Sequence, residues 1–423
     1  MPATVRRLEA GEELAFVRSV RVPFLDASSG SPADEADDRR HAAQLETDRS
    51  WVVDDRGQFV GNSLVRTMDL TVPAAPGRAC PIVRMGGVSA VGVHPTHRRR
   101  GLLSQMMDRM LEDCRSRGEP VAGLLASESI IYGRYGFGLS TDAVQYEIEA
   151  ARSGFTRPVP DPGLRLVEKD EAAKLLPEIW ERNRTARAGE PNRTPEFWEE
   201  ILEDRPDHRR GAGPYFFAAC DEGYVSYRAR EEGDVLRGDS ADVVVEEISA
   251  ADPEVAAALW RFVLDLDLIG TVTLRRRPVD EPVRWRLKDP RRLLTRHVYD
   301  RLYLRILDVS ASLEQRGYRT EGRLALDLLP ADVGSSGDPA AGTWVLEAGP
   351  AGAECKPASG NKRDHRQPDL RMRVTDLGSL YLGGVKASTL AAAGRVEELT
   401  AGSLDAADRL FASGPDPLTV TGF

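Results

Sequence analysis

The residues between Val88 and Met107 could build a site for a bound anion. The valines that open this segment are typical of a β-strand, and the apolar residues after Gly101 recur at helical spacing, so a strand should lead through a turn into a helix. The first N–H groups of a helix lack partners within it and attract anions. The turn Arg98–Gly101 adds forked donors and a glycine that lets phosphate oxygens come close. This pattern predicts a pyrophosphate site, whereas the plainer interpretation of the arginine run is a solvent-exposed helix face.

Tyr132 is the second residue that could do chemistry. It lies within Ser127–Gly138, a segment rich in glycine and aromatic residues that follows a predicted buried strand at Val121–Ala126. A phenol held beside a substrate can donate its proton to it. Tyrosines near glycine turns often serve packing alone, so the residues themselves leave a core aromatic as an open alternative.

The C-terminal segment Pro415–Phe423 is typical of a docked tail, and a frayed end is the alternative. Its two prolines reduce the freedom of the unfolded chain, apolar residues alternate along it, and an aromatic side chain ends it. A docked tail would bring its terminal carboxylate against the protein. With a reference pKa of about 3.5, that carboxylate can act as a base only if burial or a positioned water helps.

Several stretches resemble known acetyltransferases. The pattern R-x-x-G-x-x at Arg98–Leu103 resembles the acyl-CoA signature of the GNAT superfamily, with Leu103 where glycine or alanine is usual. The segment Val91–Gly136, together with Asp376–Gly384 and Lys386–Ala393 near the other end of the chain, resembles the Eis (enhanced intracellular survival) family. This resemblance covers nearly all of the 423 residues.

The resemblance implies an N-acetyltransferase, which moves an acetyl group directly from acetyl-CoA, its co-substrate, to an amine. It makes Tyr132 the general acid for the CoA sulfur and the C-terminal carboxylate of Phe423 the general base. The strand backbone that would pair with the pantetheine arm is that of Val91, Gly92 and Val93. The residues that would hold the pyrophosphate are Arg99, Arg100, Gly101, Leu102, Leu103 and Ser104, and those at the pantetheine end are Ser127 and Glu128.

The resemblance also implies an acceptor, since the family is known for acetylating aminoglycosides in a wide, acidic cleft. Two departures bear on that expectation: Gly422 stands where an acidic residue precedes the terminal Phe, and Ala90 stands where the family has an aromatic residue. Asp26 is then the remaining acidic residue expected in the cleft. Aminoglycosides or related polyamines are the leading acceptors. The alternatives are a protein lysine Nε-acetyltransferase and a non-catalytic lipid or small-molecule binding module.

Composition limits the partners of the chain. A net charge of −10 argues against nucleic acid, and the acidic segment Asp34–Asp38, interpreted as a solvated loop, favours cationic partners. The four isolated cysteines and six scattered histidines indicate neither a disulfide framework nor a metal site. No apolar run has the length of a membrane span and the N-terminus lacks the apolar core of a signal peptide, so we expect a cytoplasmic protein. The resemblance implies a homohexamer.

The order of predicted elements is α+β in character. With the resemblance, it predicts two tandem GNAT-like domains, followed by a domain like the sterol carrier proteins that ends in the catalytic carboxylate. The predicted boundaries are residues 1–155, 156–298 and 299–423. The second GNAT-like domain should lack a cofactor site, because its corresponding turn, Ser249–Asp252, contains neither arginine nor glycine.

The pattern predicts individual elements as well. Besides the helix that follows Gly101, the expected helices are Leu14–Val20, Glu168–Asn183, Pro195–Glu203, Pro253–Leu266, Asp376–Leu382, Thr389–Ala393 and Leu404–Ala412. Besides Val88–Val93 and Val121–Ala126, the expected strands are Ser50–Asp54, Phe59–Met68, Tyr215–Cys220, Tyr224–Arg228, Val243–Ile248, Thr271–Leu274, Leu302–Leu307, Leu324–Leu328, Thr343–Glu347 and Leu370–Val374.

Overall fold

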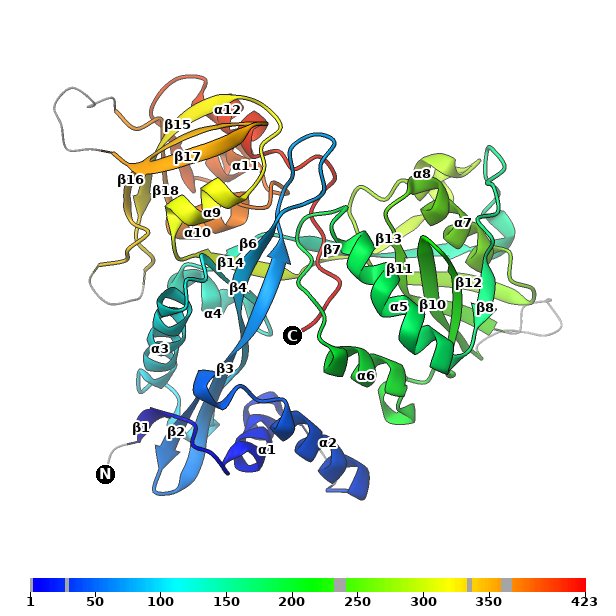
Figure 1. The fold of residues 1–423 in the computed structure, drawn as a ribbon, viewed down its shortest axis with the longest axis horizontal. Helices are drawn as coiled ribbons and strands as arrows, with labels where there is room; N and C mark the ends of the chain where they lie inside the picture. Colours follow the sequence, from blue (N-terminus) through cyan, green and yellow to red (C-terminus); the bar gives the residue numbers. More distant parts are fainter. Residues whose placement is uncertain (1–2, 27–29, 232–240, 333–336, 359–366) are drawn as a thin grey trace.

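Three β-sheets, each covered by helices, organise the chain (Figure 1). The computed structural model describes residues 3–26, 30–231, 241–332, 337–358 and 367–423. Each sheet is the centre of one lobe, and the C-terminus lies between the first and second lobes. The predicted α+β class, with two GNAT-like domains and a third domain like the sterol carrier proteins, is confirmed.

The first sheet has seven strands in the order β1-β2-β3-β4-β5-β14-β6. Strands β1 to β4 are antiparallel neighbours, whereas β4 and β5 are parallel and are joined by a crossover helix, α3. The strands are β1 (Thr4–Arg7), β2 (Ser50–Asp55), β3 (Gln58–Thr71), β4 (Ile82–Val93), β5 (Val121–Leu125), β14 (Leu302–Ile306) and β6 (Gly138–Leu139).

Helices cover both faces of the first sheet because β2 is apolar on both faces. Val52 packs with Phe16 of α1 on one face, and Val53 packs with Met106 of α3 on the other, as the alternation of side chains along a strand requires. The helices of this domain are α1 (Glu13–Phe24), α2 (Pro32–Ala43), α3 (Leu102–Ser116) and α4 (Ser129–Tyr132).

The acidic segment Asp34–Asp38 is part of α2, so the prediction of a solvated loop was wrong. Ser31 and Asp34 form a capping box, and Pro32 opens the helix, which together start α2 at this point. The buried carboxylate of Asp38 pairs with Arg18 at 3.2 Å and with Arg21 at 2.5 Å. Its charge is therefore neutralised within the protein.

The second sheet repeats the plan of the first, in the order β13-β7-β12-β11-β10-β9-β8. Its parallel pair, β11 and β12, is joined by α7. The strands are β13 (Leu294–Asp300), β7 (Asp142–Glu149), β12 (Ile269–Arg277), β11 (Ala241–Ala250), β10 (Gly223–Arg230), β9 (Tyr215–Cys220) and β8 (Arg165–Val167). The helices are α5 (Lys169–Arg184), α6 (Pro195–Glu203), α7 (Pro253–Leu264) and α8 (Val283–Arg286).

The third sheet has five strands in the order β17-β16-β15-β18-β19. Its apolar core continues into that of the first domain, since Leu70 and Met85 belong to the same buried cluster as Leu326 and Leu377. The strands are β15 (Gly322–Leu329), β16 (Gly342–Gly349), β17 (Gly352–Pro357), β18 (Leu370–Arg373) and β19 (Val396–Glu398). The helices are α9 (Val309–Gln315), α10 (Val374–Leu380), α11 (Ala387–Ala392) and α12 (Ser403–Phe411).

Two strands cross the domain boundaries that the sequence suggested at residues 155 and 298. Strand β7 comes before the first of these, yet it lies between β12 and β13 of the second sheet. Strand β14 comes after the second, yet it pairs with β5 of the first sheet, with Leu302 opposite Leu125. An apolar run marks a strand without marking its partner, so the sequence could not show this exchange.

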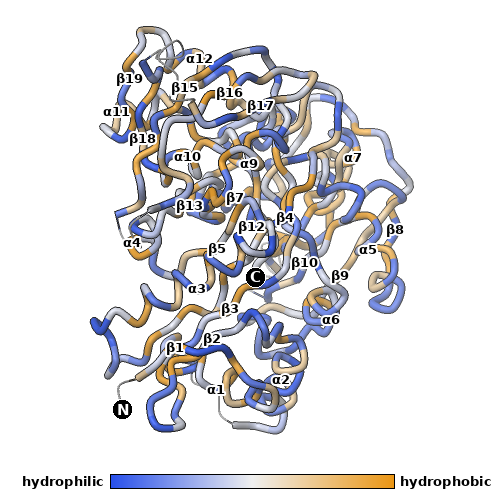
Figure 2. Tube along the Cα trace, turned by 60° about the vertical axis from the view of Figure 1, so that its left-hand side comes forward, coloured by the Kyte–Doolittle hydropathy of each residue, from blue (hydrophilic) through white to orange (hydrophobic). Residues whose placement is uncertain are grey.

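The C-terminal residue lies deep within the assembled lobes. Figure 2, turned from the view of Figure 1, again places it between strands of the first and second sheets. Within the described residues, no helix combines the length and apolar character that crossing a membrane requires.

We expect that a fragment ending at Asp300 will not retain a folded first domain. It keeps β13 and loses β14, whose Leu302, Leu304 and Ile306 are fully buried, and each such side chain contributes about 1.5 to 3 kcal/mol by burial. Circular dichroism during heating, compared with a fragment ending at Asp308 that keeps β14 and lacks the same later elements, measures the loss. A cooperative transition in the shorter fragment at the temperature of the full chain would contradict the role of β14.

Candidate active site

Strand β4 carries a bulge just before Val91. Between the pairs Leu64–Ser89 and Asn62–Gly92, β4 has one more residue than β3, and Ala90 adopts a φ of 50°. The side-chain amide of Asn62 donates a hydrogen bond to the Ala90 carbonyl inside this bulge. A bulge bends its strand and increases the local twist, so β4 changes direction where the cofactor residues were expected.

Beyond the bulge, one edge of β4 is open. Strand β4 pairs with β5 only through Met85–Gly87, although it continues to Val93. On its other edge Gly92 and Val93 pair with β3. In the described part of the chain no strand pairs with the β5 side of Val91–Val93, so this edge can accept an extended chain such as a pantetheine arm.

The arginine turn leads into α3 as the sequence predicted. Gly101 precedes the helix with a φ of +74°, and no side chain caps the helix there. A Cβ at Gly101 would meet no atom within 4 Å, which leaves the helix N-terminus open to an anion. Arg99 and Arg100 are exposed beside it.

The other predicted cofactor residues take different positions. Leu102 packs into the core and Leu103 is half-buried, so only their backbone N–H groups could face an anion. The Ser104 hydroxyl lies 3.0 Å from the hydroxyl of Tyr135. Ser127 and Glu128 are exposed between β5 and α4.

The corresponding helix of the second domain, α7, is capped. The carboxylate of Asp252 accepts hydrogen bonds from the backbone N–H groups of Glu254 at 2.7 Å and Val255 at 3.1 Å. These N–H groups are among those that would otherwise face an anion. That this domain has no acyl-CoA site stays a prediction.

Tyr132 ends α4 inside the apolar cluster that α3 forms with Val65 and Val88. Its side chain is buried, and its ring meets that of Phe137 edge to face. Burial raises the pKa of the Tyr132 hydroxyl, and a hydrogen bond with Ser127 opposes the rise. The phenol therefore keeps its proton at neutral pH, as a general acid must.

The C-terminal tail is held by a buried carboxylate of the second domain. Glu190, in the loop between α5 and α6, accepts hydrogen bonds from the backbone N–H of Val420 at 2.7 Å and of Thr421 at 2.9 Å, and another from the Thr421 hydroxyl. Burial raises the pKa of Glu190, while the nearby Arg193 and these donors oppose the rise. The tail thus satisfies a group that would otherwise be buried without partners.

Two arginines complete the attachment. The guanidinium of Arg193 donates to the Thr421 hydroxyl at 2.9 Å and forms a bidentate ion pair with Glu247. Arg301, between β13 and β14, donates to the carbonyls of Thr419 at 3.0 Å and Val420 at 2.9 Å. Because these donors come from the second domain and from the connection into the first sheet, the tail lies where the two domains meet.

Phe423 lies against β4 at the last residue that pairs with β5. A Cβ placed on Gly87 would be 3.2 Å from the Phe423 ring, and one on Gly422 would be 4.0 Å from Leu125 at the end of β5. Val88, the next residue of β4, belongs to the cluster of Tyr132. Since consecutive residues of a strand face opposite sides, Phe423 and Tyr132 approach the opening between β4 and β5 from opposite faces.

A cavity of about 1500 Å³ lies between the first two domains and ends at Phe423. Its walls come from α2 and β3 of the first domain, from α6 and β10 to β12 of the second, and from the tail. Among the described lining residues Phe423 is present, whereas Tyr132 and the predicted Asp26 are absent. Asp26 is exposed just after α1, so the structure does not bring it to this cavity.

Sequence reasoning missed Glu190, Arg193 and Arg301, which hold the tail. Glu190 and Arg193 lie in a loop that carries no helical or strand pattern, and a charged loop residue is normally expected in solvent. No signal in a single sequence distinguishes such a residue from an exposed one.

Three domain families match the chain in order. An acetyltransferase (GNAT) domain matches residues 4–140, a second acetyltransferase (GNAT) domain matches residues 189–306, and a sterol carrier protein domain matches residues 309–420. The first match contains the bulge of β4, the start of α3 and Tyr132.

Relatives match over most of their length. An uncharacterized N-acetyltransferase of Streptomyces avermitilis is 35% identical over 92% of this chain and 93% of its own, and N-acetyltransferase Eis of Mycobacterium tuberculosis is 33% identical over 84% of each chain. The crystal structure of Eis1 from Mycobacterium abscessus, 30% identical, superposes with a TM-score of 0.84 over 99% of this chain and 100% of that one. A GCN5-related N-acetyltransferase from Anabaena variabilis, 17% identical with a TM-score of 0.80, shares the fold.

We predict that Gly101→Ala weakens acetyl-CoA binding, because the new Cβ occupies the space in front of the α3 N-terminus. A loss of roughly tenfold corresponds to about one charge-assisted hydrogen bond. Gly118→Ala is the matched control, since Gly118, beyond the other end of α3, has a φ of +68° and equally open surroundings. Both variants bear the same backbone strain of about 1 to 2 kcal/mol. Titration calorimetry with acetyl-CoA compares them, and equal affinities would remove Gly101 from the site.

Proposed function

The chain belongs to the Eis family of GNAT N-acetyltransferases, and from that premise we propose that Tyr132 and the C-terminal carboxylate of Phe423 carry out its reaction. Acetyl-CoA is the co-substrate, as for GNAT acetyltransferases generally. The single observation that carries the proposal is the contact of Phe423 with Gly87, where β4 and β5 part.

The proposed reaction is a direct transfer. A neutral amine nitrogen forms a bond to the thioester carbonyl carbon, and the bond from that carbon to sulfur breaks. The carboxylate of Phe423 takes the proton that the amine nitrogen loses, and Tyr132 gives its proton to the departing sulfur. Exchange with water then returns both groups to their starting protonation states. The products are an acetylated amine and the free thiol, and no covalent bond to the protein is required.

Phe423 and Tyr132 approach the opening between β4 and β5 from opposite faces of the sheet, and this arrangement supports their roles as base and acid. An amine that enters through the cavity meets the carboxylate first, while the sulfur leaves toward the face of Tyr132. A terminal carboxylate is a weak base with a reference pKa of about 3.5. It suffices because the N–H becomes strongly acidic as the new bond forms. The attachment through Glu190 gives the carboxylate a fixed position, which is what proximity requires.

The acceptor is an amine in this proposal. Aminoglycosides or related polyamines stay a prediction from the family, as do a homohexamer and a cytoplasmic location. The acidic residue that was expected to favour such cations, Asp26, lies outside the described lining of the cavity. The charged residues that do line the cavity indicate a more specific class of acceptor.

Tyr132→Phe should lose most of its turnover and keep its affinity for acetyl-CoA. The ring stays in its apolar cluster, so packing is preserved, while the proton donor is removed. General-acid catalysis contributes roughly 10²- to 10⁴-fold to a rate. Thiol release in single turnovers and calorimetric titration measure the two quantities. Tyr135→Phe is the control, because Tyr135 belongs to the same cluster and its hydroxyl pairs with Ser104. Unchanged turnover in Tyr132→Phe would exclude it as the acid.

Adding one glycine after Phe423 should abolish turnover. The extra residue moves the carboxylate by about 3.5 Å, while Val420 and Thr421 keep their hydrogen bonds to Glu190. One glycine added before Met1 is the control, since it changes the chain length equally. An enzyme extended at its C-terminus that remains fully active would reject the terminal base.

A further inference from the structure

The cavity that ends at Phe423 has the opposite charge balance to the chain as a whole. Among the described residues that line it are eleven arginines, against seven acidic side chains and the terminal carboxylate. The whole chain has a net charge of −10. Arginines therefore outnumber carboxylates in this described lining, where the family resemblance led us to expect an acidic surface for polycations.

Three of the seven acidic side chains form ion pairs with arginines of the lining. Glu247 pairs with Arg193 at 2.7 Å, Glu246 with Arg276 at 3.2 Å, and Asp204 with Arg209 at 3.1 Å. Three glutamates of α6, namely Glu196, Glu199 and Glu200, are exposed. Within the described lining, the acidic groups without an ion pair are thus these three exposed glutamates, Glu46 and the terminal carboxylate.

Arg66 is the arginine that stands out. It is half-buried on β3, its Nε is buried without a hydrogen-bond partner, and it forms no ion pair with any residue in the described ranges. Burial lowers the pKa of its guanidinium, and the more distant Glu200 and Glu46 oppose the change. The carboxylate of Glu46 is already engaged by the backbone N–H and hydroxyl of Thr67.

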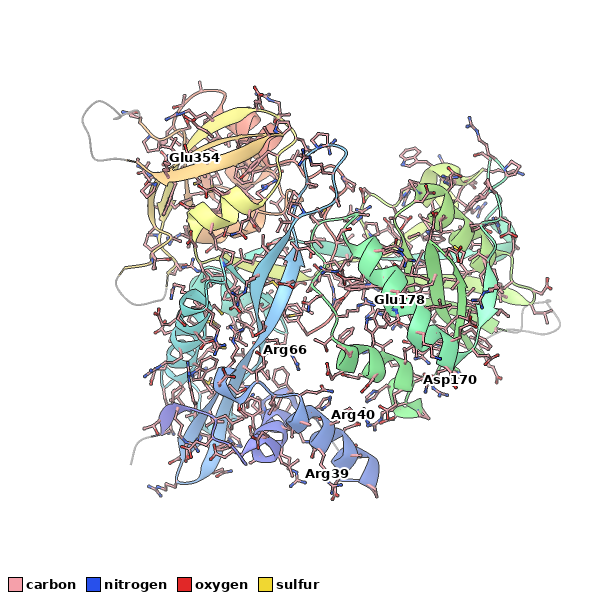
Figure 3. All side chains as sticks on the ribbon, in the orientation of Figure 1. Arg39, Arg40, Arg66, Asp170, Glu178 and Glu354 are labelled. Carbon is pink, nitrogen blue, oxygen red and sulfur yellow. The ribbon has the colours of Figure 1, made fainter. Side chains whose placement is uncertain are left out.

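Arg66 lies next to the reacting end of the tail. It is the cross-strand partner of Gly87, the glycine on which the Phe423 ring rests. Partners in adjacent strands project from the same face of a sheet, so Arg66 and Phe423 share one face. Figure 3 shows Arg66 on β3 and Arg40 of α2 on the side of the first domain that faces α6. The cavity therefore offers a cation without an ion pair on the same sheet face as Phe423.

We propose that the acceptor carries an anionic group, a carboxylate or a phosphate, that pairs with Arg66 while its amine meets the carboxylate of Phe423. This assignment rests on the proposed function and narrows its acceptor to amines that also bear a negative charge. A guanidinium without partners in a partly buried position binds oxyanions through its forked donors. A polycation, in contrast, would have to bring a further positive charge close to Arg66.

Matched acceptors can test the proposal. The panel is 6-aminohexanoate, its neutral amide 6-aminohexanamide, 1,6-diaminohexane, 6-aminohexyl phosphate and an aminoglycoside, each assayed by thiol release from acetyl-CoA. We expect kcat/KM for 6-aminohexanoate or for the phosphate to exceed that for the amide by about tenfold to a hundredfold, the usual worth of a charged contact. Whichever of the two anions is preferred identifies the source of the negative charge. Equal values for amide and anions, or a preference for the diamine, would overturn the proposal.

Variants then assign the preference to Arg66. Arg66→Leu should bring the ratio of anion to amide close to one, and Arg66→Lys should retain part of it. Arg39→Leu is the control and should keep the full ratio, because Arg39 is exposed on α2, pairs with Glu35 and does not line the cavity. A ratio that survives in Arg66→Leu would reject Arg66 as the anion site.

The proposed function and this inference fail in different ways. Acetylation of the diamine or the aminoglycoside without any preference for anions leaves the acetyltransfer mechanism intact and rejects the inference. If no amine is acetylated, the mechanism fails, and titration calorimetry of 6-aminohexanoate in the presence of CoA still decides the inference. Binding that Arg66→Leu weakens at least tenfold would support it, and absent or equal binding would reject it.

Discussion

The structure depends on one buried carboxylate, that of Glu190. A carboxylate removed from water is costly unless hydrogen bonds replace its hydration. In this protein most of those hydrogen bonds come from the last residues of the chain, Val420 and Thr421. If the tail left, Glu190 would lose these hydrogen bonds and keep its ion pair with Arg193 at 3.9 Å. The loop of the second domain that carries Glu190 thus holds the residues that precede the C-terminal carboxylate.

Strand β14 makes the first domain depend on a later part of the chain in a similar way. Strand β14 completes the sheet that contains β4 and β5, and the third domain shares the apolar core beneath them. One strand of the first sheet, β14, and the Phe423 ring that lies against β4 both come from parts of the chain that follow residue 298. The three domains therefore share strands and an apolar core, even though their sequences match three separate families.

Much of this architecture could be predicted from local patterns. Helix α6 begins and ends at the predicted residues, and so does β9, because a capping threonine and a strand of aromatic and apolar residues mark them. Strands β17 and β19 and helix α9 were not expected, since their short segments lack a clear period. Strand β7 was also missed, although its apolar residues Val144, Tyr146 and Ile148 alternate with polar ones. The predicted α3 turn has the expected backbone. The partners of Glu190, Arg66 and Arg301 depend on contacts between residues far apart in the chain, which no local pattern contains.

The two GNAT domains also show that the charge preference of a site depends on the groups nearest to it. Each has a helix after the first strand of its parallel pair. An uncapped glycine leaves the N-terminus of α3 open, while the carboxylate of Asp252 fills that of α7. The two helix N-termini therefore differ in how many of their N–H groups have a partner. The same reasoning applies to the acceptor cavity, where a chain of net charge −10 has an arginine without an ion pair on the sheet face that Phe423 contacts. Potential in a partly buried site is dominated by the nearest uncompensated groups, because distant charges are screened by water and salt. Arg66 should thus influence the choice of acceptor more strongly than the acidic composition of the whole chain.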